Sequence, residues 1–177
     1  MSQEPSASLS SKGGVATQPA AWRLGSPARG CGVDSTMADR AAAALERMPH
    51  AAPMRVVRGL VAAQGESSSW WLVVEEEHPL LVDGELPALA GVELVAQAAA
   101  AHAALAGASG GGGVLLRARG MRFEADTLPV GERLVATVRR TDGTDGATAA
   151  FQVELDDAAG RRLLAGSLLV RLFEEAA

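Results

Sequence analysis

The longest run of small apolar side chains lies in the middle of the chain, at residues 86–107, "LPALAGVELVAQAAAAHAALAG". A helix that is apolar on all sides is buried, so this run predicts a core helix. Pro87 stands near its first turn, where the N–H that proline lacks has no helical partner. Glu93 and Gln97 interrupt the run one helical turn apart, which places both side chains on one face. These two residues are therefore the first candidates for chemistry.

Strand-like runs flank this helix on both sides. Two precede it, at 55–64 and 68–77, and four follow it, at 114–125, 132–141, 147–156 and 162–173. Turn-forming segments rich in Gly, Asp and Pro separate the runs. A shorter helix opens at Met37, "MADRAAAALERM", and the prolines of the following loop end it. Trp70 and Trp71 should point to opposite faces of their strand, so at most one of them lines a pocket.

This order of elements predicts an α+β domain with a mostly antiparallel sheet and a segregated helix. The long apolar helix needs cover on every side, and a sheet that curls around it provides that cover. We therefore expect the hotdog fold, as a single domain over residues 37–177. Residues 1–36 are rich in Ser, Gly and Pro and lack apolar periodicity, so we expect a disordered extension there. Translation from Met37 is a hypothesis that the intact mass of the native protein tests.

Composition and charge narrow the classes of protein that remain. The run at 86–107 is long enough to span a membrane, at about 20 residues, but Glu93, Gln97 and His102 oppose insertion. The formal net charge of −5 argues against a nucleic-acid-binding protein, because such proteins are normally basic. The single Cys31 builds neither a disulfide framework nor a zinc site. We expect a cytoplasmic protein with no metal.

Three segments resemble the β-hydroxyacyl-ACP dehydratases of fatty-acid synthesis, which have the hotdog fold. "MPHAAPMRVV" resembles their "LPHRYPFLLVD" opening, and "LPALAGVELVAQ" resembles their "MPG…(E/D)AMAQ" helix. "RFEADTLPVGERLVATV" resembles their "RFKRPVVPGDQL" strand pair. The similarity covers residues 44–175. Within the family, "LPALAGVELVAQ" is most similar to the dehydratase-like proteins of aryl polyene biosynthesis.

The resemblance implies removal of water from a 3-hydroxyacyl thioester carried on the phosphopantetheine of an acyl carrier protein, with no other cofactor. Glu93 takes the position of the catalytic acid and Gln97 that of a substrate-binding glutamine. The helix start at Ala90 and Gly91 would offer a backbone N–H to the thioester oxygen. Apolar surroundings disfavour a charged carboxylate, which suits an acid at Glu93. A structural acid bonded to a backbone amide is the alternative for this residue.

The family's base histidine, in "GHFPG" fourteen residues before the acid, has no direct counterpart. Position 79 is Pro79, and His78 lies fifteen residues before Glu93 without the flanking glycine. We assign His78 as the base, acting from the opposite protomer, with a loop histidine of no function as the alternative. His50 matches a family position that is not the base, so a structural role is favoured. His102 is half a turn out of phase with Glu93 and should be packed or exposed.

Carrier proteins are strongly acidic, so a surface that binds one should present arginines. The main candidates are Arg117, Arg119 and Arg122 on one predicted strand, where Arg117 and Arg119 share a face. Further candidates are Arg139, Arg140, Arg161 and Arg162. For each arginine a solvated sheet face is the alternative.

Three functions fit the sequence. The leading one is a 3-hydroxyacyl-carrier-protein dehydratase that feeds a fatty-acid or polyene chain. The second is a non-catalytic hotdog subunit that pairs with an active dehydratase, which the displaced His78 favours. The third is an acyl thioesterase, since hotdog thioesterases also use a helix carboxylate. We expect a homodimer or a heterodimer with another hotdog dehydratase, because the exposed edge strands of such a sheet need pairing.

Overall fold

The structure is a computed structural model, and it describes residues 34–107, 113–141 and 148–172. Its elements in chain order are α1 (Ser35–Glu46), β1 (Val57–Gln64), β2 (Ser67–Val73), β3 (Leu86–Pro87), the short 3₁₀ helix η1 (Ala88–Ala90), α2 (Gly91–Leu105), β4 (Gly113–Phe123), β5 (Thr127–Leu128), β6 (Arg133–Thr141), β7 (Thr148–Asp156) and β8 (Arg162–Leu172). Of the expected disordered extension, residues 1–33 lie outside the described residues, whereas Ser35 and Thr36 belong to α1, which corrects the boundary predicted at residue 36.

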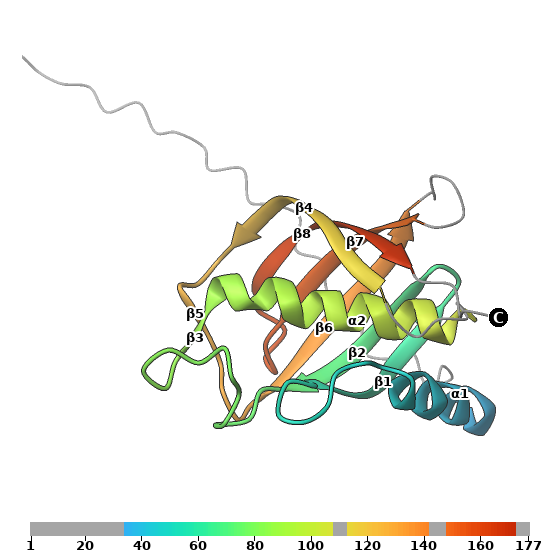
Figure 1. Cartoon of the computed structure of the whole chain (residues 1–177), viewed down its shortest axis with the longest axis horizontal. Coiled ribbons are helices and arrows are strands. Elements are labelled where there is room, and N and C mark those ends of the chain that lie inside the picture. Colours follow the sequence, from blue (N-terminus) through green and yellow to red (C-terminus); the bar gives the residue numbers. More distant parts are fainter. Residues whose placement is uncertain (1–33, 108–112, 142–147, 173–177) are drawn as a thin grey trace, which may run out of the picture.

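Six strands form one antiparallel sheet in the order β1-β2-β6-β7-β8-β4. Helix α2 lies across one face of this sheet (Figure 1). This arrangement confirms the α+β hotdog fold expected from the sequence. The two-residue strands β3 and β5 form a separate ladder that the sequence did not predict. Strands this short have too few positions for alternation to be visible.

Several elements begin or end at other residues than predicted, and for two of them the structure shows the reason. Helix α1 begins at Ser35 rather than at Met37, because the side chain of Asp34 accepts a hydrogen bond of 2.7 Å from Met37 N and caps the helix. Strand β2 ends at Val73 rather than at residue 77. The chain then leaves the sheet in a turn that His78 N closes by donating to Glu75 O at 3.0 Å.

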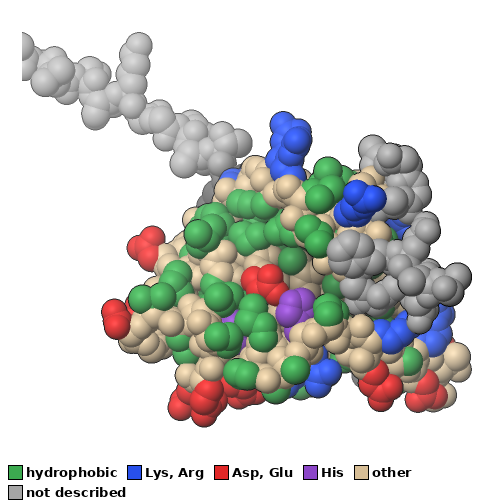
Figure 2. Space-filling view, viewed as in Figure 1, with side chains coloured by type: hydrophobic (Ala, Val, Ile, Leu, Met, Phe, Trp, Pro, Cys, Tyr) green, Lys and Arg blue, Asp and Glu red, His purple; other side chains and the backbone are tan. Residues whose placement is uncertain are grey.

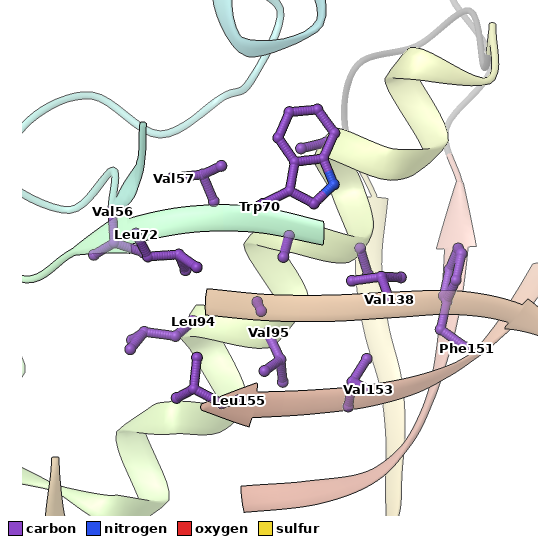
Figure 3. Close-up of a cluster of buried hydrophobic side chains, with 14 of the residues drawn as sticks. Val56, Val57, Trp70, Leu72, Leu94, Val95, Val138, Phe151, Val153 and Leu155 are labelled. Carbon is purple, nitrogen blue, oxygen red and sulfur yellow. The ribbon is translucent and has the colours of Figure 1, made fainter. Parts of the chain in front are cut away.

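The core fills the space between α2 and the sheet (Figure 3). Trp70, Leu72 and Leu155 from the sheet and Leu94 and Val95 from the helix are fully buried. The alanines of α2 let the helix approach closely, since they add little width. Gly91 shows this most clearly, because a Cβ there would lie 2.3 Å from Leu164 Cδ2.

Helix α1 secures the far end of α2. Arg40 donates to Leu105 O at 2.9 Å and Arg47 donates to Ala104 O at 3.0 Å, so both arginines bind carbonyls in the last turn of α2. The segment Ala88–Leu105 has the length and mean hydropathy, 1.4, of a membrane span. However, 67% of it is buried inside the protein, which identifies it as a core helix.

Candidate active site

Glu93 lies in the first turn of α2 and faces a groove that runs along the helix. The groove is lined by Pro49, His50, Glu93, Ala96, Gln97, Ala100, Ala103, Ala104, Gly113, Leu115, Val170 and Leu172. Figure 2 shows an acidic side chain and a histidine side by side on a largely hydrophobic surface. The Glu93 side chain is 32% exposed. It is thus less buried than its apolar sequence surroundings predict, because the groove leaves this side of α2 open.

Three hydrogen bonds fix the side chain of Gln97. Its side chain is 1% exposed, and its Oε1 accepts a hydrogen bond of 3.0 Å from Val56 N. Since a backbone N–H can only donate, this contact fixes which end of the amide is oxygen. Nε2 then donates to Met54 O and to Glu93 Oε1, both at 2.9 Å. Both N–H groups of Gln97 are therefore used within the chain, and a substrate would have to displace one of these bonds.

His50 is the histidine that the fold brings to Glu93. Its Nε2 lies 3.3 Å from Glu93 Oε1, and its side chain is 32% exposed. The two atoms are at ion-pair distance, and because a carboxylate oxygen can only accept, a hydrogen between them belongs to Nε2. The ring Nδ1 is buried and has no partner among the described residues. The sequence favoured a structural role for His50, because it does not show contacts between residues far apart in the chain. The contact with Glu93 makes His50 part of the candidate site.

These contacts distinguish the two oxygens of the Glu93 carboxylate. Oε1 accepts a hydrogen bond from Gln97 Nε2 and lies 3.3 Å from His50 Nε2, whereas Oε2 has no hydrogen bond or ion pair with any described residue. A carboxylate held through one oxygen keeps the other available to exchange a proton. Glu93 thus has one oxygen held by the protein and one open oxygen, and the residue lines the groove.

From Glu93 the groove continues toward the end of α2 along a row of alanines. Ala96, Ala100 and Ala103 follow Glu93 on one helix face. Leu115 of β4 and Val170 of β8 form the opposite wall. The distance along the helix from Glu93 to Ala104 is about 16 Å. A narrow apolar channel of this length, with one carboxylate at its head, fits a linear acyl chain.

His78 is not among the residues that line this groove. Its ring is only 2% exposed, and its Nδ1 accepts a hydrogen bond of 3.3 Å from Leu80 N. The Nε2 atom is buried without a partner among the described residues. The chain's own turn therefore encloses His78, and this conformation does not favour a reach across a dimer. The expected contact between His78 and Glu93 of the opposite protomer stays a prediction.

The backbone at the start of α2 differs from the expected thioester-binding position. Gly91 N–H donates to the carbonyl oxygens of Ala88 and Leu89, because a turn of 3₁₀ helix precedes α2. A thioester oxygen would have to compete with these bonds for Gly91 N–H. Neither Ala90 nor Gly91 lines the groove. Close packing against Leu164 accounts for the glycine without a role in binding.

His102 belongs to a separate buried cluster, as its phase along α2 predicted. Its Nδ1 lies 2.8 Å from Ser68 Oγ, which accepts a hydrogen bond of 2.8 Å from Trp70 Nε1. Burial lowers the pKa of His102; nearby Glu66 opposes this shift and Arg140 adds to it. Nothing in this cluster contacts Glu93. Within residues 34–107, 113–141 and 148–172, no three metal-binding side chains come together.

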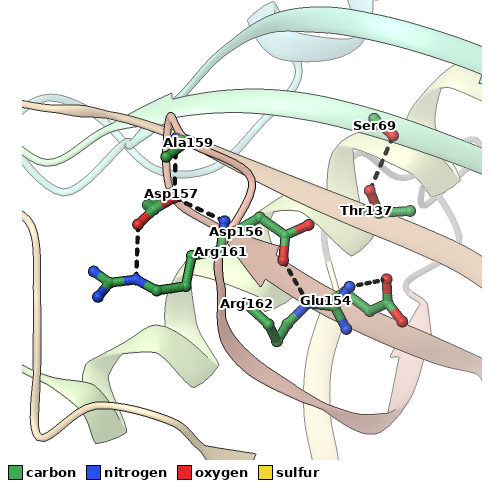
Figure 4. A network of polar contacts seen from close by, with 8 residues as sticks. All are labelled: Ser69, Thr137, Glu154, Asp156, Asp157, Ala159, Arg161 and Arg162. Carbon is green, nitrogen blue, oxygen red and sulfur yellow. Dashed lines mark hydrogen bonds and ion pairs between the residues drawn. The ribbon is translucent and has the colours of Figure 1, made fainter. Parts of the chain in front are cut away.

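Five of the seven candidate arginines fall into two groups. Arg161 pairs with Asp157 at 3.0 Å, and Arg162 pairs with Glu154 at 2.7 Å and also with Asp156 (Figure 4). These two arginines are thereby engaged within the turn between β7 and β8. In contrast, Arg117, Arg119 and Arg122 on β4 are exposed and make no ion pair with any described residue.

The chain was compared with known protein families and structures. A family model described as "ApeP-like: ApeP dehydratase" matches residues 42–175. A comparison with curated proteins gave no match.

Among solved structures, the dehydratase heterocomplex ApeI:P from Xenorhabdus doucetiae matches with a TM-score of 0.63 at 22% identity, over 74% of this chain and 91% of the other. The E. coli PaaI protein from the phenylacetic acid degradation operon matches with a TM-score of 0.53 at 15% identity, over 78% and 99%. A hypothetical thioesterase with coenzyme A from Streptococcus pneumoniae matches with a TM-score of 0.51 at 12% identity, over 67% and 87%. At these identities the structures show a shared fold.

Proposed function

Because the chain belongs to the ApeP-like dehydratase family, we propose that it removes water from a 3-hydroxyacyl thioester carried on an acyl carrier protein, in fatty-acid or aryl polyene biosynthesis. The observation that carries this proposal is the Glu93 carboxylate. His50 and Gln97 hold it through one oxygen at the head of an alanine-lined groove. A linear acyl chain lying in the groove would bring its thioester end to Glu93.

The reaction breaks a C–H bond next to the thioester carbonyl and the C–O bond of the 3-hydroxyl group. In the proposed mechanism Glu93 Oε2 takes the C–H proton and then gives it to the hydroxyl oxygen, which departs as water. The C–H electron pair becomes the new carbon–carbon double bond. Glu93 ends in its starting state. His50 and Gln97 act through Glu93 as positioning residues, since both contact Oε1.

Two other functions have some support. A non-catalytic partner subunit is favoured by the burial of His78, since this leaves the chain without a histidine in the position of the family's base. A thioesterase would use the same carboxylate to activate water for attack on the thioester. The products separate the three, because a dehydratase forms an enoyl thioester, a thioesterase releases a free thiol, and a non-catalytic subunit does neither.

The test is an assay of enoyl thioester formation from a 3-hydroxyacyl carrier protein, with this chain alone and mixed with a second hotdog dehydratase of the same gene cluster. We expect weak activity from the chain alone and clear activity from the mixture. Glu93→Gln in this chain should reduce the activity of the mixture at least about 100-fold, because an amide cannot carry the proton. The fold should persist, since the amide oxygen can still accept the hydrogen bond from Gln97 Nε2.

Glu132→Gln is the matched control, because Glu132 is exposed in a turn and lies outside the groove. Unchanged turnover in Glu93→Gln would remove Glu93 from the mechanism. Release of free thiol without enoyl product would support the thioesterase. Full activity of the mixture with Glu93→Gln, together with no activity of this chain alone, would favour the non-catalytic subunit.

A further inference from the structure

Two residues at the far end of the groove also border a second cavity. The groove that starts at Glu93 ends between α2 and the strands β4 and β8 (Figure 1). Behind this end lies a cavity of about 210 Å³, which has room for a further piece of a linear chain. Ala103 of α2 and Leu172 of β8 line both spaces. These two side chains therefore separate the groove from the second cavity.

The strand ladder fixes the position of Leu172. Its neighbour across the ladder is Gly113, the first residue of β4. A Cβ at Gly113 would lie 2.8 Å from Arg171 O and 3.1 Å from Val170 Cγ1, so the absence of a side chain lets the two strands lie close together here. Leu172 is half-buried and packs against the hydrophobic core. Its side chain thus forms the end wall of the groove.

The lining of the second cavity is more polar than that of the far half of the groove. His102, Arg140 and Phe151 line this cavity, whereas past Gln97 the groove is lined by apolar residues alone. The side chain of Arg140 is half-buried and makes no hydrogen bond or ion pair with any described residue. A hydrocarbon end that covered this guanidinium would remove its water without giving it a partner, which costs free energy. A plain hydrocarbon chain therefore gains from contact as far as Leu172 and not beyond it.

We propose that Leu172 and Ala103 set the longest acyl chain that the groove accepts, so that the site selects straight chains whose methyl end stops at Leu172. The distance along α2 from Glu93 to Ala103 is about 15 Å. Both residues would touch only the hydrocarbon end and take no part in the transfer of the proton. The inference rests on the proposed function only in taking an acyl chain as the occupant of the groove.

The test measures binding rather than turnover. A series of saturated acyl-pantetheine amides of increasing chain length is titrated into the full chain by calorimetry. These probes lack the 3-hydroxyl group and the thioester, so the protein can neither dehydrate nor hydrolyse them. In the wild type we expect the association constant to rise about fourfold with each methylene group that the groove buries. The rise should stop at a limiting length, when the methyl end reaches Leu172.

Two variants should move the limiting length in opposite directions. Ala100→Leu puts a larger side chain into the groove one turn of α2 before Ala103, so the limit should fall by about 5 Å of chain. Leu172→Ala/Arg140→Leu joins the groove to the second cavity and makes that cavity less polar. Chains beyond the wild-type limit should therefore bind this variant at least about tenfold more tightly than they bind the wild type. An unchanged limit in either folded variant, or no binding at any length, would overturn the proposal.

Leu116→Ala is the matched control, because Leu116 is 51% exposed and lines neither space. It should keep the wild-type limit, and a shifted limit in this variant would also overturn the proposal. Circular dichroism and thermal melting show whether each variant is folded. The two proposals fail separately. Binding with the expected limits but without dehydration would contradict the proposed function alone, whereas dehydration of chains of every length at equal rates would contradict the length limit alone.

Discussion

Near its start, helix α2 presents Glu93 and Gln97 to His50, and near its end it presents His102 to Ser68 and Trp70. Both clusters put a histidine beside polar groups in an otherwise apolar part of the chain. In the second cluster the Ser68 hydroxyl joins the indole N–H and the His102 Nδ1, so these three polar atoms satisfy one another. In the first, Glu93 Oε2 has no partner among the described residues and lies at a groove. Both clusters place polar groups beside an apolar helix, so polarity alone does not identify a candidate site. An unpaired polar atom at a cavity does.

The largest expected effect comes from breaking the first cluster at Gln97. Gln97→Leu leaves Val56 N–H and the Met54 carbonyl without their partner, so the free energy of unfolding should fall by about 3 kcal/mol. Dehydration should fall as well, because Glu93 loses the hydrogen bond from Gln97 Nε2. Urea denaturation measures the first effect. A loss of stability below about 1 kcal/mol would show that Gln97 does not secure the loop that carries His50.

Substitutions of His50 test whether the first cluster positions the Glu93 carboxylate. His50→Ala should reduce kcat about 10- to 100-fold and leave KM nearly unchanged, because it removes a contact to the reacting group rather than to the acyl chain. His50→Gln should recover part of the rate, since its amide can donate to Oε1. Stability should change little, because the ring is 32% exposed. If His78→Ala and not His50→Ala abolishes activity, His78 is the base that the resemblance implied.

Replacing Ser68 breaks the second cluster and leaves the residues of the first cluster unchanged. Ser68→Ala leaves Trp70 Nε1–H and His102 Nδ1 without their common partner in the core, and should cost about 2 kcal/mol of stability. The rate of dehydration should not change. Ser69→Ala is the neighbouring control, since its hydroxyl only meets Thr137 Oγ1 at 3.0 Å across β2 and β6 (Figure 4). A fall in rate for Ser68→Ala would couple the two clusters.

The smallest expected effect is a pH dependence from His102. Burial holds its pKa below the ordinary value of 6.5, so the unfolded chain binds more protons than the folded one as the pH falls below 6.5. Stability should therefore decrease between about pH 7 and about pH 5. His102→Gln should remove this part of the decrease, measured by urea denaturation across that range. An equal slope in wild type and variant would show that His102 is not the group that titrates.

The long elements and the class of fold follow from the sequence alone. Alternation along the strands, the apolar run of α2 and the turn residues between the strands predicted the six long strands, the order of elements and the hotdog fold. The phase of His102 along α2 predicted that it would not meet Glu93. These features are local, because each depends on the spacing of side chains within one helix or strand.

Which side chains of the candidate site are in contact could be seen only in the tertiary structure. His50 reaches Glu93 because the loop before β1 is tied to Gln97 through Met54 O and Val56 N. Local spacing holds no signal for such a contact. The enclosure of His78 and the use of Gly91 N–H in the 3₁₀ turn depend likewise on how the chain enters α2. The site depends on contacts between segments that are distant in the sequence, because tertiary packing, and not periodicity, fixes the distances between those segments.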